Sequence, residues 1–598
     1  MSSAVLSGAR RKSSPRLTRP APGAPPDGRI SGAPGAALQS VQCGVRGHNT
    51  VLHMGRGAAG LECRNGGRLG WIACRDGDPE GLPRGREPSQ RRKRPGRTPS
   101  SAAKPPTTTK RTQRRRTPMA KTLRVELLEQ EDIDSIFEKT VHILATHGVK
   151  VDHEEALERL AAAGAQVDRE TRMVRFSREN IEAALKSVPS SVTVRGGDEK
   201  HDFTVPDPTG RIYSTTCVQT MRYLDPDVGD YVDNTHERFA EWCRLVEQLP
   251  NIHVCAIQTP MDAPPATADV HGLNVQLQNT SKPLMLLAYC YESVPYLFDL
   301  MLARAGSAEA LRKRPLLLIN PTSLSPLVFK DMDMAQLAGA AEYDIPVAAN
   351  SLPVLGATAP GTIAGTVLLQ AVELLAFLVM SQMFKPGLPF IATVFNTTMD
   401  LGTGNALLAS SETILTRAAT AQFCKAALNV PVETFALMAD SYLPDGQTAA
   451  EKTLQPTILA MAGADILYGA GRLGGSTLAS PVELIIDDRL FAVIQRTVSG
   501  VQVDDETLAV DDIIGAGAGG HYLRRKHTLR HCREMIRPDL FVPDVLDNWI
   551  AAGRKDLQTR ATELYRELKK GLEPLSLPDD VKRDMDNVVK AADKALAN

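Results

Sequence analysis

Short apolar runs recur along the central part of the chain, each bounded by turn residues and separated from the next by a helical pattern. Runs that are apolar throughout, without alternation, are typical of parallel strands covered on both faces. Successive runs begin 30 to 44 residues apart, which leaves room for one crossover helix and two loops each time. The eight predicted strands cover residues 211–216, 252–257, 283–289, 315–320, 345–350, 388–395, 432–437 and 464–469.

Eight strand–helix units within roughly 260 residues predict an α/β fold of the (β/α)8, TIM-like barrel type, because their number and total length match that fold. A doubly wound open sheet is the alternative, since periodicity does not show whether the sheet closes. We predict an N-terminal α/β cap over residues 119–205, the barrel over 206–480, and a C-terminal helical region packed on the barrel over 481–598.

Residues 361–384 are apolar enough to suggest a membrane span. However, Gln370 and Glu373 lie near the centre of this segment, and both side chains would be costly in a bilayer. We therefore predict a buried helix packed on the sheet and no membrane partner.

The charge of the chain is divided between two unlike parts. The 69 basic and 69 acidic residues cancel overall, but residues 1–118 hold 24 basic and 6 acidic residues, and the remainder holds 45 and 63. The first part is rich in Arg, Pro, Gly, Ser and Thr and has no sustained apolar period, so we predict a disordered tail. The acidic remainder gives no reason to expect a polyanionic partner such as a nucleic acid.

Met119 opens a stretch that reads as a natural protein start followed by an amphipathic helix. We expect this residue to be the true start, which would make residues 1–118 a mis-assigned extension. A transit peptide or a nucleic-acid-binding arm on a non-enzymatic binding protein is the alternative, because the arginine clusters would attract phosphates.

The nine cysteines do not indicate a metal ribbon or a disulfide framework. Their number is odd, and no two of them form a C-x-x-C pair. We therefore predict a reducing, cytoplasmic location.

In barrel enzymes the site is built where the strands end. The residues at those predicted ends are mostly amides, hydroxyls and phenols, which suit binding and orientation of a substrate better than acid–base catalysis. The predicted substrate-binding residues are Gln258, Tyr289, Asn320, Asn350, Asn396, Asp440 and Tyr468.

Two glycine-rich segments need separate interpretations. Residues 469–476 follow the eighth predicted strand, where barrels often bind phosphate, so we predict that Gly471, Gly474 and Gly475 contact a cofactor. Residues 515–520 have the spacing of a dinucleotide motif but lack its strand–helix context, which favours a tight turn.

His521, His527 and His531 have a spacing that could hold zinc. No cysteine or carboxylate obviously completes the set, and capping or core roles are commoner for such histidines. We therefore expect no metal in this chain. A metal-dependent barrel lyase or hydrolase that uses these three histidines is the alternative function.

Several long blocks of the sequence closely resemble the trimethylamine methyltransferase family of corrinoid methyltransferases. The resemblance runs from about residue 122 to the C-terminus, and the fold of that family is a TIM-like barrel. The blocks are LPVLGATAPGTIAGTVLLQAVELLAFLVMSQMFKPGLPFI (352–391), PDGQTAAEKTL (444–454), AGADILYGAGRL (462–473), ELIIDDR (483–489) and GAGAGGHYLRRKHTLRHCRE (515–534).

The resemblance implies methyl transfer from an N-methylated amine to the Co(I) of a separate corrinoid protein, which carries the cobalamin cofactor. In that reaction the aromatic faces of Tyr289, Tyr291, Phe395 and Tyr468 could receive a cationic substrate. Asp440 could supply a counter-charge, and the predicted amide side chains could hold the carboxylate of a betaine. We also expect a homo-oligomer.

One departure from the family pattern bears on the substrate. Members specific for trimethylamine carry pyrrolysine inside the barrel, whereas this chain contains only standard residues, and the matching position falls near residues 444–452. We therefore predict a quaternary amine such as glycine betaine, proline betaine or carnitine as the methyl donor.

Overall fold

The computed structural model describes residues 123–597, apart from 476, 538 and 542. The predicted disordered tail and the predicted start at Met119 lie outside the described residues.

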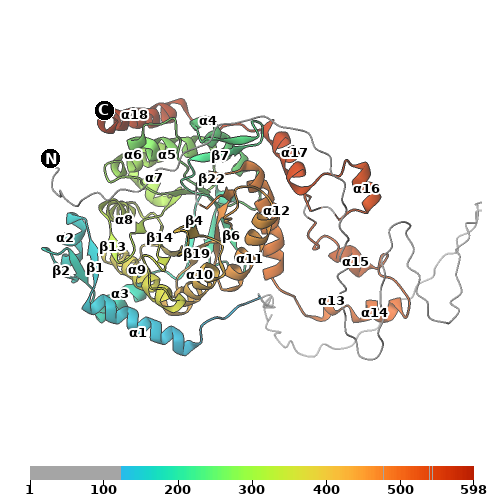
Figure 1. Cartoon of the computed structure of the whole chain (residues 1–598), viewed down its shortest axis with the longest axis horizontal. Coiled ribbons are helices and arrows are strands. Elements are labelled where there is room, and N and C mark those ends of the chain that lie inside the picture. The colour runs from blue at the N-terminus through green and yellow to red at the C-terminus, as the bar shows by residue number, and fades with distance from the viewer. Residues whose placement is uncertain (1–122, 476, 538, 542, 598) are drawn as a thin grey trace, which may run out of the picture. The chain divides into compact units, whose positions relative to one another are not determined.

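Eight parallel strands form the centre of the fold (Figure 1). Each coincides with one of the eight predicted apolar runs, and the strands pair in the order in which they follow one another along the chain. They are β6 (Tyr213–Thr216), β9 (Cys255–Ala256), β10 (Leu284–Leu286), β11 (Leu317–Ile319), β14 (Val347–Ser351), β16 (Phe390–Val394), β19 (Val432–Phe435) and β20 (Ile466–Ala470).

A short parallel contact joins the two edges of this sheet. Thr215 pairs with Val254, just before β9. The Thr216 amide donates to the Val254 carbonyl, and the Val254 amide donates to the Ser214 carbonyl, both at 3.0 Å. On its other side β6 pairs with β20, so the eight strands form a ring. The predicted barrel is confirmed, and the alternative of an open doubly wound sheet is wrong.

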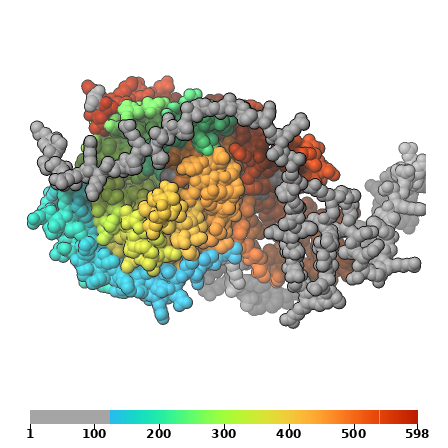
Figure 2. Space-filling view, in the orientation of Figure 1, coloured from blue at the N-terminus to red at the C-terminus, as the bar shows by residue number. Residues whose placement is uncertain are grey.

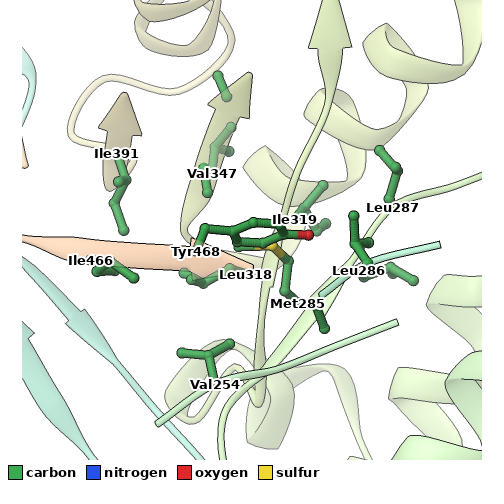
Figure 3. Close-up of a cluster of buried hydrophobic side chains, with 14 of the residues drawn as sticks. Val254, Met285, Leu286, Leu287, Leu318, Ile319, Val347, Ile391, Ile466 and Tyr468 are labelled. Carbon is green, nitrogen blue, oxygen red and sulfur yellow. The ribbon is translucent and has the colours of Figure 1, made fainter. Parts of the chain in front are cut away.

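Helices follow every strand of the barrel and cover its outside (Figure 1). Apolar side chains from different strands meet inside the barrel, among them Ile391 and Ile466 (Figure 3). The covering helices are α4 (His236–Gln248), α5 (Ala268–Asn279), α6 (Val294–Ala305), α7 (Ala308–Lys313), α8 (Asp331–Tyr343), α9 (Ile363–Phe384), α10 (Ser411–Phe423), α11 (Gly446–Met461) and α12 (Pro481–Val498).

Within the described residues, α9 is the one helix long and apolar enough to cross a membrane. It packs between barrel strands β14 and β16 on one side and the N-terminal helices α1 (Gln130–Thr146) and α3 (Arg178–Ser187) on the other. Figure 2 shows the blue residues of the N-terminal region lying against the yellow residues of this part of the chain. The prediction of a buried helix is confirmed.

The two polar residues near the centre of α9 bind the loops that follow the strands. The Gln370 amide donates to the carbonyls of Ser351 and Phe395, at 2.9 and 3.2 Å. The buried Glu373 carboxylate accepts hydrogen bonds from three serine hydroxyls and one backbone amide. These donors are Ser323, Ser325 and Ser351, at 2.6 to 2.7 Å, and the Leu327 amide, at 2.9 Å.

The N-terminal region forms a small α/β layer beside the barrel. Its antiparallel strands β1 (Val149–Val151), β3 (Met173–Arg175) and β2 (Gln166–Asp168) flank α2 (Glu154–Ala162) in sequence. A strand from a barrel loop, β13 (Val328–Phe329), pairs in parallel with β1. The hairpin of β4 (Val192–Val194) and β5 (Phe203–Val205) leads from α3 into the barrel.

Short strands extend the barrel at the ends of its own strands. The hairpin of β7 (Arg222–Asp225) and β8 (Asp230–Asp233) joins β21 (Arg472–Leu473) and β22 (Leu478–Ala479) in one small sheet. A second sheet consists of β15 (Val354–Leu355), β17 (Thr397–Met399) and β18 (Ala406–Leu407), and β12 (Thr322–Ser323) pairs with β14.

The two last helices pack on the outside of the barrel. Helix α17 (Leu557–Lys569) contacts α12 and α4, and α18 (Asp579–Leu596) contacts α5 and α6. Residues 499–556, which we call the C-terminal arm, lie between α12 and α17 in the sequence. Leu540 is the one described residue of the arm that is buried. The arm contains α13 (Asp505–Leu508), α14 (Val510–Ala516), α15 (Lys526–His531) and α16 (Leu546–Ala551).

Candidate functional site

Three aromatic rings lie side by side where β16, β19 and β20 end. The rings of Phe395 and Phe435 stack with their centroids 3.8 Å apart, and Tyr468 lies 4.0 Å from Phe435 at a tilt of 44°. All three side chains are buried, and Figure 3 shows Tyr468 among apolar side chains from several strands. We call these three residues the aromatic shelf.

A carboxyl group lies beneath the shelf, inside the barrel. Glu433 precedes Phe435 by two residues on β19, so both side chains point to the same face of the strand. Its carboxylate accepts from the hydroxyls of Thr215 and Thr393, at 3.1 and 3.0 Å. Because β20 separates β6 from β19 in the sheet, the bond from Thr215 crosses the barrel interior. Burial raises the pKa of Glu433 to about 7.

The sequence interpretation missed Glu433 because it treated residues 432–437 only as an apolar strand. The available signal was that Glu433 is the single charged residue of that run. A lone carboxylate in a fully buried strand is costly unless it is paired or protonated, and such positions often mark a functional site.

Two of the predicted asparagines have side-chain atoms without a hydrogen-bond partner among the described residues. Asn396 is fully buried, and neither its amide nitrogen nor its carbonyl oxygen has a partner. Asn350 donates to the Thr322 hydroxyl at 3.3 Å, but its carbonyl oxygen has none. The hydroxyls of Thr397 and Tyr468 are also buried without a hydrogen-bond partner among the described residues. An unpaired buried polar group costs about 1–3 kcal/mol, so each of these groups would gain from a polar ligand.

Three other predicted residues are engaged within the chain. Gln258 accepts a hydrogen bond from the Asn234 amide at 2.8 Å. Asn320 donates to the Ala348 carbonyl at 2.5 Å. The Tyr289 hydroxyl is 2.8 Å from the Thr259 hydroxyl, and burial raises the pKa of Tyr289. Their role as substrate contacts stays a prediction.

Asp440 and Tyr291 do not join the aromatic shelf. The Asp440 carboxylate accepts from the backbone amides of Leu408 and Ala409, at 3.1 to 3.2 Å, and so holds the segment before α10. Tyr291 is exposed and makes an edge-to-face contact with His153 of the N-terminal region, with ring centroids 5.6 Å apart.

A buried arginine that sequence reasoning did not identify holds the shelf in place. Arg417 of α10 donates to the Asn396 carbonyl at 2.6 Å and to the Phe435 carbonyl at 2.9 Å. It also donates to the Leu408 carbonyl and the Gln455 side chain, and its guanidinium lies 5.4 Å from the Phe395 ring centroid. Burial lowers the pKa of Arg417 to about 9.

The predicted cofactor glycines form a loop whose amides bind within the chain. The Gly471 amide donates to Asp487 at 2.7 Å, and Asp487 in turn pairs with the buried Lys452 at 2.7 Å. The Gly474 and Gly475 amides donate to the carbonyls of Ser441 and Ala439, at 2.7 and 3.1 Å. A Cβ on Gly471 would lie 2.3 Å from Trp242, so packing requires glycine at that position. A cofactor contact for the three glycines stays a prediction.

The three histidines of the alternative function lie in the C-terminal arm, away from the ends of the barrel strands in the sequence. His527 and His531 are on α15 and His521 precedes it. Glu506 of α13 joins His527 and His531 as a third group that could hold a metal, whereas His521 is not part of that group. This arrangement gives the hydrolase alternative no support at the barrel mouth.

Comparison with known proteins gives a family match over most of the chain. The model of the family described as Trimethylamine methyltransferase (MTTB) matches residues 90–596. The chain is 30% identical over 482 residues to the trimethylamine methyltransferase MttB of Methanosarcina barkeri, covering 79% of this chain and 96% of that protein. It is 29% identical over 461 residues to the MttB of Desulfitobacterium hafniense (strain DSM 10664 / DCB-2), covering 77% and 92%.

A relative with a different substrate in its name also matches. The glycine betaine methyltransferase of Desulfitobacterium hafniense (strain Y51) is 25% identical over 459 residues, covering 76% of this chain and 94% of that protein. Among solved structures, the Methanosarcina barkeri monomethylamine methyltransferase (MtmB) aligns with a TM-score of 0.41 at 11% identity, covering 74% of this chain and 93% of that one.

The buried Glu433 predicts a pH-dependent stability. Its pKa is about 7 in the folded chain against 4.5 ordinarily, so the folded state holds the proton more tightly than the unfolded state. The free energy of unfolding should therefore fall as pH rises from about 4.5 through 7. The free energy of unfolding of Glu433→Gln should not show this fall. Between pH 5 and pH 8 the variant should therefore gain about 2–3 kcal/mol in the free energy of unfolding relative to the unmodified chain, as measured by chemical unfolding.

The control is Glu342→Gln on α8, because the Glu342 side chain is exposed. If Glu433→Gln and Glu342→Gln show the same pH dependence as the unmodified chain, the carboxyl of Glu433 does not titrate in this range.

Proposed function

The chain belongs to the trimethylamine methyltransferase family, and from that premise we propose that it transfers a methyl group from a quaternary amine to the Co(I) of a corrinoid protein. The observation that carries the substrate proposal is the aromatic shelf with Glu433 beneath it. We propose a betaine as the substrate class, and a separate partner protein as the carrier of the corrinoid.

The aromatic shelf suits a quaternary ammonium group. Such a cation has no N–H, so it cannot be held by hydrogen bonds to its nitrogen, but the faces of aromatic rings attract it. Phe395, Phe435 and Tyr468 offer three rings whose centroids lie 3.8 and 4.0 Å from that of the neighbouring ring. Arg417 fixes the ends of the first two strands, β16 and β19. Their burial excludes water, which strengthens the attraction.

Glu433 supplies the charge that distinguishes a cation from a neutral ligand. Its fully buried carboxyl lies on the same strand as Phe435, and a cation above it would favour the ionised form. After methyl loss the amine is neutral, and the attraction that held the substrate disappears. The product therefore binds more weakly than the substrate.

The unpartnered groups after β16 suit the carboxylate of a betaine. The amide of the fully buried Asn396 is a donor without a partner among the described residues. A carboxylate can accept from this amide, and this would remove the cost of leaving it unpaired. The corrinoid supplies the nucleophile of the reaction, so the residues of this chain bind the donor, orient its methyl group and exclude water.

The direct test is a methyl-transfer assay with the purified chain, a reduced corrinoid protein and single methyl donors. We expect the absorption change from Co(I) to methyl-Co(III) with glycine betaine, proline betaine or carnitine, and none with trimethylamine. Transfer from trimethylamine alone would contradict the betaine proposal. Absence of transfer from every donor, with a corrinoid protein active toward another methyltransferase, would contradict the methyl-transfer proposal itself.

A matched pair of variants tests the shelf. Phe435→Leu removes one aromatic face at a similar volume, and cation–π attraction in a dry site amounts to about 1–2 kcal/mol. We expect KM for the quaternary amine to rise about tenfold, with a smaller change in kcat. The control is Phe423→Leu on α10, which removes a buried ring away from the shelf. Equal effects of the two substitutions would show that the shelf does not bind the cation.

We also propose that the chain forms a homo-oligomer through the C-terminal arm. Helices α13 to α16 have four to seven residues and bury no side chain in the described chain. Helices this short do not persist in water without a packing surface. The side chains of Leu523, Leu529 and Ile514 are 85%, 76% and 73% exposed, which leaves an apolar surface for a second copy.

Light scattering on the full chain should report a dimer or a larger assembly at micromolar concentration. Glu substitution of Leu523 and Leu529 should shift the assembly toward monomer. Leu454→Glu on α11, where the side chain is 53% exposed, is the control and should leave the mass unchanged. A monomeric unmodified chain would contradict the proposal.

The proposed cytoplasmic location rests on the thiols. The six described cysteines are free, and Cys243 and Cys255 remain unbonded although their sulfur atoms are 3.8 Å apart. Free thiols this close together favour a reducing compartment.

A further inference from the structure

We propose that Glu506, His527 and His531 bind a zinc ion that joins two helices of the C-terminal arm. One ligand atom from each of the three residues lies within 4.8 Å of the other two. The proposed site is structural and separate from the aromatic shelf, so it does not rest on the methyl-transfer proposal.

The two histidines are placed for a shared ligand by the geometry of α15. They are four residues apart, so they project from the same face of the helix, and their ring centroids are 4.2 Å apart. Two imidazoles at this spacing with one carboxylate form a nitrogen and oxygen ligand set that zinc accepts.

Glu506 comes from a different helix, which is why the sequence spacing did not reveal it. It lies on α13, 21 residues before His527, and its carboxylate is 3.4 Å from Nε2 of His531. Arg530 pairs with the same carboxylate oxygen at 2.9 Å. A zinc ion would take the place of the guanidinium at that oxygen.

Each histidine has a second contact that orients its ring. Nδ1 of His531 is 2.8 Å from the Glu534 carboxylate, and its Nε2 faces the Glu506 carboxylate at 3.4 Å. Nε2 of His527 is 2.9 Å from the Glu506 carbonyl, so Nδ1 is the nitrogen that this contact does not use. Histidines that bind metals almost always donate their other ring nitrogen to a carboxylate or a carbonyl in this way.

The arm needs a stabilising element of this kind because it has almost no core. Leu540 is its one buried described residue, and α13 and α15 have four and six residues. Small segments without a sufficient core are commonly held by a metal, whose binding free energy then contributes to folding. A zinc ion between α13 and α15 would fix the intervening chain at both ends. Three protein ligands leave a fourth position for water or for a group from another molecule.

The first experiment measures zinc by mass spectrometry in the full chain purified without chelators or a metal-affinity tag. We expect about one zinc per chain, and loss of most of it in Glu506→Gln, His527→Ala and His531→Ala. The matched control is His521→Ala, which removes a histidine of the same arm outside the cluster. Equal zinc in all four variants would show an adventitious ion only and would overturn the proposal.

The second experiment titrates the metal-free full chain with Co(II), which replaces zinc and absorbs visible light. Saturation at one equivalent with strong d–d bands, absent from the His527→Ala and His531→Ala variants, is the expected result. Hydrogen exchange of residues 505–531 should slow when zinc is added to the unmodified chain and stay unchanged in those variants. Lack of stoichiometric binding by the unmodified chain, both as purified and on titration, would refute the site. Neither readout depends on methyl transfer, so the two proposals can fail separately.

Discussion

Closure of the sheet between β6 and the residue before β9 is the contact on which the rest of the molecule depends. Two backbone hydrogen bonds of 3.0 Å, between residues 214–216 and Val254, join edges that an open sheet would leave unpaired. Because the paired strands are parallel, all eight end at the same side of the ring. Phe395, Phe435 and Tyr468 lie on or directly after three strands that pair in succession, β16, β19 and β20, although Phe395 and Tyr468 are 73 positions apart in the sequence.

The strand ends are held from outside by charged side chains on three successive helices. Glu373 of α9 binds the segment after β11 and the last residue of β14, and Arg417 of α10 binds the segment after β16 and the last residue of β19. Lys452 of α11 is joined through Asp487 to the loop after β20. Each of these groups is buried, and removal of its charge would leave several donors or acceptors unpaired. The position of the aromatic shelf therefore depends on residues that do not belong to it.

The sequence predicted the strands well because a fully buried parallel strand is an uninterrupted apolar run, and each run in the chain corresponds to a strand. It also predicted that the segment around Gln370 and Glu373 is a buried helix. Periodicity did not show closure, which one bridge decides, and the barrel was predicted from the number and total length of the strand–helix units. Arg417 was missed because its partners are mainly backbone carbonyls, and Glu506 because it meets His531 from another helix. Asn396 and Tyr468 were predicted from their positions at strand ends alone, and their contact with a substrate stays a prediction.

The division between inward-facing and outward-facing residues has an evolutionary consequence. Glu373, Arg417 and Lys452 fix the backbone, whereas the side chains that face the barrel interior at positions 433, 435 and 468 do not hold the loops together. In the proposed site, substitutions at those interior positions would alter ligand preference while the framework that presents them persists. A single ancestral scaffold can in this way give rise to enzymes for different methylated amines, and directed evolution of this chain has the same small set of positions to explore.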